Sequence, residues 1–354
     1  MKVYDKNEVK EQVIALLNYQ YQLEERGPWF YRESYNEGKE YAPLYSAYDE
    51  EIMRLKFAQL LLQKYNSKKD VTLSPKEIER FLIDKTYKTV YPSILQTLNC
   101  LGADMEGVCL DGLWLAGSSF INLENVHVDL DKLGDKNLIN TRFRGASFSG
   151  SFDKCKLALA IFEDCTSEKP INPQEVYGKT LYRSKLGGIE IEGSLDGVNI
   201  SYTNFSKSKG TIVINPQKCI NKTLEGVLFN NCYVLGDYDE QTGQYEEASF
   251  AGCEINYSIF KGVKNIPTID IGTISYSDIY RTDLTGVRII GTAGWENRGF
   301  LFSDCTMNGE DFNLAIPSTY ENKKLVDINL VKETKQKIKE KKSIFSRFKK
   351  KNEK

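Results

Sequence analysis

The single histidine of the chain, His127, is the residue best suited to acid–base chemistry near neutral pH. An imidazole is the usual base of Ser-His-Asp and Cys-His sites, so any such site would have to use this residue. It stands between Val126 and Val128, an alternating apolar context that is typical of one side of a sheet. We therefore expect a structural role for His127. Sites that need several histidines, such as the HExxH zinc motif, are excluded.

Two pairs of carboxylates are further candidates for chemistry: Asp129 with Asp131, and Glu163 with Asp164. Such pairs can bind a hard divalent cation or act as acid and base. Neither is accompanied by more ligands at a recognisable spacing, so we expect solvated charges. GxxxxGK[ST] and GxGxxG phosphate loops are also absent. The sequence thus predicts no catalytic, metal or cofactor site, and the chain is not expected to be an enzyme.

The chain has eight cysteines, and no two of them lie within four positions of each other. The CxxC pairs of zinc ribbons and redox sites are therefore absent. Five of the cysteines fall on the small position of a five-residue pattern, where we expect buried thiols that pack as small apolar groups. These five are Cys155, Cys165, Cys232, Cys253 and Cys305.

A repeat of five residues organises most of the chain. From Ser93 to Phe120, every fifth residue is large or apolar and follows a mostly smaller inward residue by two positions. A period of five matches neither the 3.6 of a helix nor the 2 of a strand. The pattern recurs in blocks to about Phe312. The predicted inward-pointing repeat centres are Leu95, Met105, Leu110, Leu115, Phe120, Phe143, Phe148, Leu157, Phe162, Ile200, Phe205, Phe229, Phe250, Ile255, Phe260, Ile274, Ile279, Leu284, Ile289, Phe302, Met307 and Phe312.

The pattern resembles the pentapeptide-repeat family, whose five-residue unit is written A(D/N)LXX. The best matches are Ala103-Asp104-Met105, Thr203-Asn204-Phe205, Ser277-Asp278-Ile279 and Thr282-Asp283-Leu284, and the resemblance covers residues 93–315. It implies a mainly β fold, a right-handed four-sided β-helix in which four units make one coil. Backbone groups then pair with the neighbouring coils at about 4.8 Å.

Three parts are expected along the chain. Residues 1–90 form a small helical N-terminal region, with helices predicted at 6–26, at 49–65 and after Ser74, whose capping box with Glu77 is a strong start signal. Residues 91–316 form the β-helix, and the helices either form a small bundle or lie against its first coil. Residues 317–354 form a basic tail that is helical or disordered.

Several stretches break the phase of the repeat. Two of them, 236–247 and 291–299, are typical of loops that project from a corner; the others are 121–140, 165–190, 206–226 and 262–270. Loops of this kind commonly form the binding face of a solenoid. Tolerated surface insertions are the alternative interpretation.

Charge and hydropathy set the expected location. Residues 101–320 carry 19 basic against 29 acidic residues, a net of −10, whereas residues 331–354 carry 11 against 3, a net of +8. This tail also contains Ile344, Phe345 and Phe348, which suit contact with an anionic membrane surface; a solubilising tail is the alternative. Without a run of 18 apolar residues or a signal-peptide core, we expect a cytoplasmic location, with export to a host cell or peripheral membrane attachment as alternatives.

These observations predict a non-catalytic bacterial scaffold that presents loops and an acidic surface to a protein partner of unknown identity, without a cofactor. One alternative is an exported effector or peripheral membrane component localised by the tail. The other rests on the resemblance, because some pentapeptide-repeat proteins bind DNA gyrase by imitating duplex DNA. Direct nucleic-acid binding is not expected, since no ordered basic face accompanies the tail. The oligomeric state is left open.

Overall fold

A computed structural model divides the chain into two compact units, which are described separately. Unit 1 comprises Met1–Glu192 with Lys207–Gly210, and unit 2 comprises Gly193–Ser206 with Thr211–Lys354. Both are mainly β, and the α-helices among the described residues belong to unit 1. The residues described are 2–18, 47–67, 69–210, 212–220, 223–230, 233–245, 254–256, 258–261, 268–270, 274–275, 277–280, 282, 284, 288–290 and 300–316.

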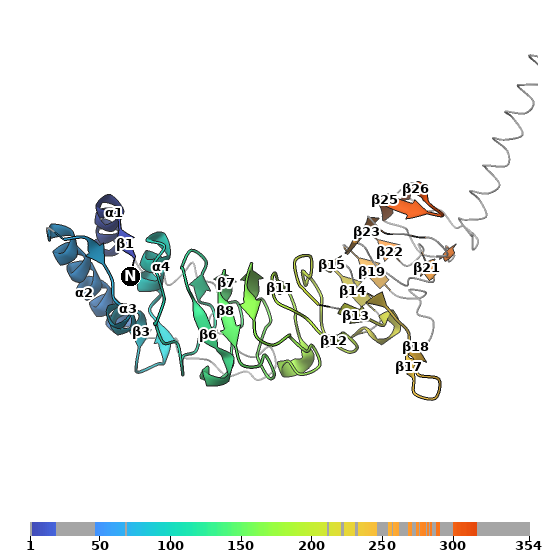
Figure 1. The fold of residues 1–354 in the computed structure, drawn as a ribbon, viewed down its shortest axis with the longest axis horizontal. Helices are drawn as coiled ribbons and strands as arrows, with labels where there is room; N and C mark the ends of the chain where they lie inside the picture. Colours follow the sequence, from blue (N-terminus) through green and yellow to red (C-terminus); the bar gives the residue numbers. More distant parts are fainter. Residues whose placement is uncertain are drawn as a thin grey trace, which may run out of the picture. The chain divides into compact units, whose positions relative to one another are not determined.

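The helices gather at one end of unit 1, drawn in blue to blue-green in Figure 1. Two short antiparallel pairs connect them, β1 (Val3–Tyr4) with β2 (Val71–Thr72) and β3 (Ile83–Asp84) with β4 (Thr89–Val90). The helices themselves are α1 (Lys6–Leu17), α2 (Ala47–Asn66), α3 (Pro75–Leu82) and α4 (Pro92–Cys100).

Local sequence explains where α1 and α3 begin. The hydroxyl of Ser74 accepts a hydrogen bond from the backbone N–H of Glu77, and the Glu77 carboxylate accepts one from the N–H of Ser74, which confirms the predicted capping box. The carboxylate of Asp5 accepts hydrogen bonds from the first turn of α1 in the same way. Helix α1 ends at Leu17 with Asn18 as its C-cap, so the predicted helix over 6–26 was too long.

Helix α4 corrects the predicted start of the repeat. Leu95 is buried, but it lies in this helix, so its assignment as a β-helix repeat centre is wrong. Pro92 occupies the first helical position, where its fixed φ and missing N–H favour a helix. Leu95 and Leu98 are three positions apart and share a helix face. The five-residue pattern also places apolar residues three positions apart, so a short stretch of it fits both a helix and a β-helix.

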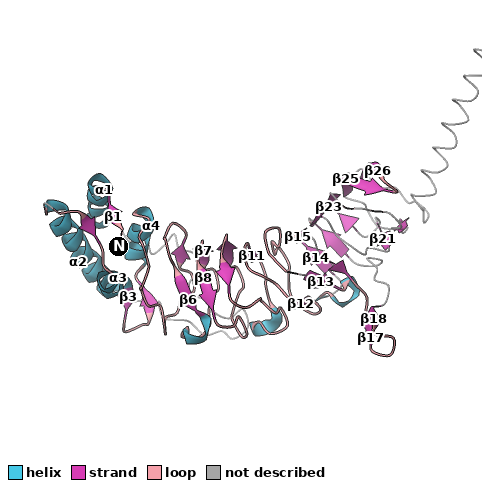
Figure 2. Ribbon diagram, in the orientation of Figure 1, coloured by secondary structure: helices cyan, strands magenta, loops and turns pink. Residues whose placement is uncertain are grey.

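Beyond α4, the strands of unit 1 stack in parallel to form a β-solenoid (Figure 2). One sheet has the order β11-β9-β7-β5 and the other β10-β8-β6. The strands are β5 (Ser119–Phe120), β7 (Arg142–Arg144), β9 (Ile161–Glu163) and β11 (Lys185–Leu186) in the first, and β6 (His127–Asp129), β8 (Ser147–Ser149) and β10 (Thr166–Ser167) in the second, with single 3-10 turns at Leu130–Lys132 and Tyr177–Lys179.

Stacked aromatic rings fill the interior of unit 1. The register places Phe120 opposite Phe143, and Phe143 opposite Phe162. Their rings are nearly parallel, with centroids 5.1 Å and 6.0 Å apart, and all three side chains are fully buried. Burying a phenylalanine stabilises the fold by about 1.5–3 kcal/mol relative to exposure. A column of stacked rings therefore runs through three successive coils, and Phe148 and Phe152 pack edge-on against it.

Unit 2 continues the same principle with parallel strands. The Phe205 and Phe229 rings stack with centroids 5.5 Å apart. One sheet has the order β12 (Gly193–Ser194), β13 (Ile212–Ile214) and β16 (Tyr233–Val234), and a second has β14 (Thr223–Glu225), β19 (Glu254–Asn256) and β22 (Ile274–Ser275). A third sheet has β15 (Leu228–Asn230), β20 (Ile259–Lys261), β23 (Ser277–Tyr280), β25 (Phe300–Met307) and β26 (Glu310–Ile316). Strand β21 (Thr268–Asp270) pairs with β24 (Arg288–Ile290), and a 3-10 turn spans Pro216–Lys218.

The end of unit 2 departs from the predicted parallel coil. Strand β25 pairs in parallel with β23 and in antiparallel with β26, so the predicted centres Met307 and Phe312 lie on the two arms of a hairpin. Phe312 is buried against Phe302, whereas Met307 is only half-buried. The reason is the two-residue turn Asn308-Gly309, in which both residues have positive φ. This dipeptide favours a tight hairpin turn.

The other predicted repeat centres with described side chains are buried. They are Met105, Leu110, Leu115, Phe120, Phe143, Phe148, Leu157, Phe162, Ile200, Phe205, Phe229, Ile279, Leu284 and Phe302. Phe250 and the side chains of Ile255, Phe260, Ile274 and Ile289 fall outside the described part of the chain. Burial of the thiols is confirmed for Cys155, Cys165 and Cys305, while Cys232 and Cys253 lie outside the described residues.

The helical part of unit 1 closes the open edge of the first coil. A β-solenoid ends in backbone groups that have no further coil to pair with, and such an edge invites another chain. Here these groups bond to residues of the N-terminal region: Lys2 Nζ donates to Gly102 O (2.6 Å), Asp104 N to Tyr4 Oη (3.3 Å), Cys109 N to Glu79 Oε1 (2.8 Å), Trp114 N to Lys88 O (2.7 Å) and Thr89 Oγ1 to Trp114 O (3.2 Å).

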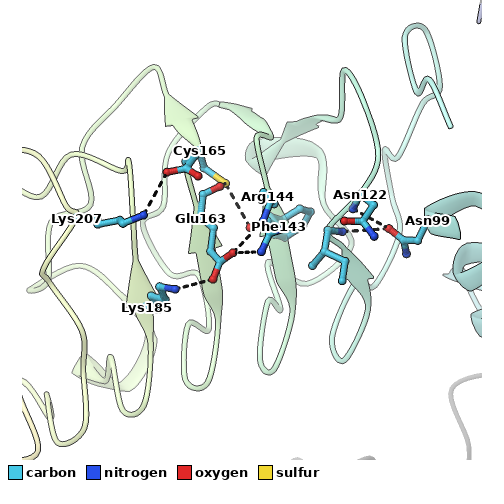
Figure 3. A network of polar contacts seen from close by, with 10 residues as sticks. Asn99, Asn122, Phe143, Arg144, Glu163, Cys165, Lys185 and Lys207 are labelled. Carbon is cyan, nitrogen blue, oxygen red and sulfur yellow. Dashed lines mark hydrogen bonds and ion pairs between the residues drawn. The ribbon is translucent and has the colours of Figure 1, made fainter. Parts of the chain in front are cut away.

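Asn99 completes this closure at strand β5. Its side-chain amide donates to Ser119 O (2.6 Å) and accepts from the N–H groups of Ile121 (3.1 Å) and Asn122 (3.2 Å), as Figure 3 shows in part. An asparagine amide has the same donor and acceptor groups as a peptide unit. At the end of α4 it therefore stands in for the backbone of a preceding coil.

Candidate functional site

The stretch predicted to form a projecting loop, 236–247, contains a small β-hairpin in unit 2. Strand β17 (Tyr238–Asp239) pairs in antiparallel with β18 (Gln244–Tyr245). The hairpin extends away from the stacked strands of unit 2 (Figure 1). Tyr238 is 54% exposed although it is large and aromatic. The stretch is thus an ordered protrusion that carries an exposed ring.

The base of the hairpin is held by a buried asparagine and a lysine. Asn215 Nδ2 donates to Asp237 Oδ1 at 2.7 Å, and Lys218 Nζ lies 2.8 Å from the same oxygen. Lys218 also lies 3.8 Å from Asp196. These contacts tie the first arm of the hairpin to the 3-10 turn at Pro216–Lys218. Charge-assisted hydrogen bonds of this kind are stronger than neutral ones.

The tip of the hairpin is organised by Asp239. Its carboxylate accepts hydrogen bonds from the Gln241 N–H and the Thr242 hydroxyl, both at 2.8 Å. Gly243 supplies the positive φ that the turn needs, and its N–H donates to Asp239 O. The Thr242 hydroxyl, followed by the Gln241 N–H, lowers the pKa of Asp239 below its usual range. The tip is therefore anionic and preformed.

This arrangement suits recognition of a basic protein surface. Tyr238 offers a rigid amphipathic ring, a side chain that gives contact area at low entropic cost. The neighbouring carboxylate of Glu240 is exposed and can accept charge-assisted hydrogen bonds from arginine or lysine. A preformed loop loses less conformational entropy on binding than a flexible one.

The other segments predicted to take part in binding lie outside the described residues. They are the loop 291–299 and the basic tail 317–354, with Ile344, Phe345 and Phe348.

The carboxylate pair Glu163 and Asp164 lies in a row of ion pairs on unit 1 (Figure 3). Glu163 Oε1 lies 2.5 Å from Lys185 Nζ, and its Oε2 accepts from Arg144 Nε at 2.9 Å and Nη2 at 2.6 Å. Hydrogen bonds first from Lys185 and then from Arg144 lower the pKa of Glu163 to about 2. Asp164 lies 3.9 Å from Lys207. Glu163 is therefore a permanently ionised member of this row of ion pairs and is unsuited to proton transfer near neutral pH.

The second predicted carboxylate pair, Asp129 and Asp131, is also paired with lysines. Lys132 Nζ lies 2.9 Å from Asp129, and Lys136 Nζ lies 2.7 Å from Asp131. These ammonium groups are the first cause of the lowered pKa of each carboxylate. Within the described part of the chain, no three histidine, cysteine, aspartate or glutamate side chains are grouped as a metal site would need.

His127 has two hydroxyl partners that the sequence did not indicate. Its Nδ1 lies 3.0 Å from Ser147 Oγ, and its Nε2 lies 3.1 Å from Ser149 Oγ. The ring is exposed on the outer side of strand β6, and both serines belong to β8. Only the register of the coils brings these residues together, so neither spacing nor composition could have found them.

A comparison of the chain with protein-family models, with curated proteins and with solved structures finds no match. No helix in the described residues is long and apolar enough to cross a lipid bilayer. The function is therefore argued from the geometry of the two units.

Proposed function

We propose that this chain is a bacterial protein-binding scaffold of the pentapeptide-repeat type, and that the hairpin β17–β18 is a principal contact with a basic protein partner. The scaffold is a right-handed, four-sided β-helix with five residues on each regular side. The scaffold holds the projecting hairpin in a fixed position and needs no cofactor.

Three features support the fold part of this proposal. Large residues five positions apart, such as Leu110, Leu115 and Phe120, are all buried. Successive coils pair in parallel, as Phe143 does with Phe120 and Phe162. Glycines at positions 107, 112 and 117 share a positive φ, so the backbone turns at the same point of each unit.

The exposed Tyr238 on an anchored acidic hairpin is the observation that carries the function. The side chain of Tyr238 is 54% exposed, and Asn215 and Lys218 hold its strand in place. Interfaces are enriched in tyrosine, and a rigid anchor flanked by charges is a common form of binding hot spot. Acidic flanks select a partner that is rich in arginine or lysine.

The DNA-mimicking alternative receives less support from unit 1. Imitation of duplex DNA requires an even run of negative charge. In the row of ion pairs in Figure 3, however, Glu163 is flanked by Arg144 and Lys185, which neutralise its charge. Attachment of the basic tail to a membrane remains a separate proposal drawn from the sequence.

Site-specific photo-cross-linking tests the role of the hairpin. A photoreactive phenylalanine replaces Tyr238 in the full chain expressed in its native cell, and the matched control carries it at Tyr177, which is 60% exposed in unit 1. We expect a discrete cross-linked protein from position 238 and not from 177. Charge reversal by Glu240→Lys should weaken that cross-link, because it removes a carboxylate from the partner's basic surface.

Equal cross-linking from both positions, or no loss on charge reversal, would contradict the proposed role of the hairpin. Liposome flotation of the same protein, with and without the tail charges, separates a membrane function from this one. A chain that floats and gives no cross-link from position 238 would overturn the protein-binding proposal in favour of membrane attachment.

A further inference from the structure

His127 and two serines form a hydrogen-bonded chain on the outer side of unit 1. His127 on β6 lies directly opposite Ser147 on β8, and Ser149 follows two positions later on the same side of the strand. The imidazole thus lies between two hydroxyls, with Nδ1 3.0 Å from Ser147 Oγ and Nε2 3.1 Å from Ser149 Oγ. These distances are within hydrogen-bonding range for both nitrogens.

The partners of the two serines fit one tautomer of the ring. Ser147 Oγ also lies 3.4 Å from the carbonyl oxygen of Val126, which is longer than an ordinary hydroxyl hydrogen bond. In the tautomer that carries its proton on Nδ1, Ser147 accepts a hydrogen bond from the ring and can turn its own proton toward this carbonyl oxygen. The lone pair of Nε2 is then free to accept the hydroxyl proton of Ser149. This assigned order, Val126, Ser147, His127, Ser149, is that of an orienting group, a base and a nucleophile.

The geometry points to Ser149 as a base-activated nucleophile that accepts acyl groups from activated esters. Ser149 Oγ forms a bond to the carbonyl carbon while its proton moves to His127 Nε2. The tetrahedral adduct then collapses, the bond to the leaving oxygen breaks with its electron pair, and the departing alcohol takes the proton from Nε2. The products are an O-acyl ester of Ser149 and the free alcohol.

The surroundings limit the class of acyl donor. His127 is exposed on the outer side of the sheet, so water solvates both the base and the developing charge. Stabilisation of an oxyanion is strongest in a site that excludes water. The donor must therefore bring its own good leaving group, as aryl esters do. Ser147 is the positioning residue, since it acts only by holding His127 in the reactive tautomer.

Acetylation by 4-nitrophenyl acetate tests the assignment on the full-length protein. We expect nitrophenolate release with one acetyl group mapped by peptide mass spectrometry to Ser149, in an ester that hydroxylamine removes. General bases contribute about 10²–10⁴-fold to such reactions, so His127→Gln should slow Ser149 labelling by at least about 100-fold.

Two further variants separate positioning from general reactivity. Ser147→Ala should slow the labelling of Ser149, and Ser147→Thr, which restores the hydroxyl, should recover the rate. Ser119→Ala, which removes a serine of the other sheet, should leave the labelling rate unchanged. Circular dichroism confirms that each variant is folded. Acetyl groups found only on lysines, or equal rates of Ser149 labelling in the native protein and His127→Gln, would overturn the assignment.

Discussion

The first coil of unit 1 and the last described strands of unit 2 close the same kind of edge by different means. At the first coil, backbone groups of Gly102, Asp104 and Ser119 bond mainly to side chains of the N-terminal region. At the end of unit 2, β26 folds back on β25 and closes that strand with its own backbone. The first closure uses residues up to 100 positions away in the sequence, as with Lys2 and Gly102. The second uses the strand that follows β25 directly in the sequence.

The two closures should differ in how much stability a single substitution removes. A closure made from many separate side chains loses one bond at a time, because each bond has its own donor and acceptor. A closure made by one strand depends on the few contacts that hold that strand in place. In unit 2 one such contact is the edge-to-face pair of Phe302 and Phe312, with centroids 5.3 Å apart. Substitutions should therefore act more strongly at the hairpin than at any single residue of the helical closure.

The largest effect is expected from Phe312→Ala. This side chain is 1% exposed, and its removal leaves a cavity against Phe302. Phenylalanine-to-alanine changes in cores cost about 3–5 kcal/mol. Urea denaturation should show this loss, and hydrogen exchange should show it first in β25. Phe312→Leu is the matched control and should cost less, since it refills much of the volume. A loss below about 1 kcal/mol for Phe312→Ala would show that β26 is held by other contacts.

The next effect is expected from Asn99→Ala in the helical closure. The change leaves Ser119 O and the N–H groups of Ile121 and Asn122 without their partner, which should cost about 1–3 kcal/mol. Asn99→Asp keeps the oxygen that accepts from the two N–H groups and should cost less. Asn122→Ala, a change of an exposed side chain in the same corner, is the control. If Asn122→Ala and Asn99→Ala have equal midpoints of thermal unfolding, the Asn99 amide does not close this edge.

Acid should distinguish side-chain contacts from backbone pairing. Bonds from Lys185 and Arg144 lower the pKa of Glu163 to about 2, so ionised Glu163 stabilises unit 1 above its usual pKa of about 4.5. That stability is lost as the pH falls from about 4.5 toward 2. Because the pair is on the surface, the effect should be about 0.2–1 kcal/mol. Thermal midpoints of the native protein and Glu163→Gln should differ at pH 7 and converge at pH 2, whereas the exposed control Glu168→Gln should differ little at either pH.

The smallest effect is expected inside unit 1, at a residue that belongs to neither of the two closures. The hydroxyl of Ser167 is buried without a hydrogen-bond partner, at a position that pairs with Phe148. Ser167→Ala should therefore be neutral or stabilising by up to about 1 kcal/mol. Ser184 is the matched control, since its buried hydroxyl donates to Leu157 O at 2.6 Å, and Ser184→Ala should destabilise by about 1 kcal/mol. Equal losses in both variants would mean that Ser167 is satisfied in solution.

The sequence predicted the interior of the solenoid better than its two ends. The inward positions from Met105 to Phe120 follow from a period of five, because that period fits no other regular structure. The same pattern was wrongly extended to Leu95, where two apolar residues three apart also fit a helix and where Pro92 was the overlooked signal. At the other end, Asn308-Gly309 is a hairpin signal that the five-residue pattern concealed.

The candidate sites were predictable only in part. The polar, glycine-containing stretch around Asp239 and Gly243 indicated a projecting loop, and its own turn chemistry explains the hairpin. The partners of His127 could not be predicted, because Ser147 and Ser149 become neighbours only when the lengths of all the intervening sides are known. A single change of phase would have moved both serines away from the ring.

The short spacing along the chain between paired strands also governs how the chain folds. Phe143 and Phe162 are paired 19 positions apart (162 − 143), and Phe120 and Phe143 are 23 apart (143 − 120). Each new coil therefore closes a short loop of similar entropy onto the coil before it, as in a repeat protein that grows from one end. The helices around Asn99 provide the first template for this growth. We expect unit 1 to acquire protection from hydrogen exchange in chain order during refolding, with β5 ahead of β7 and β7 ahead of β9.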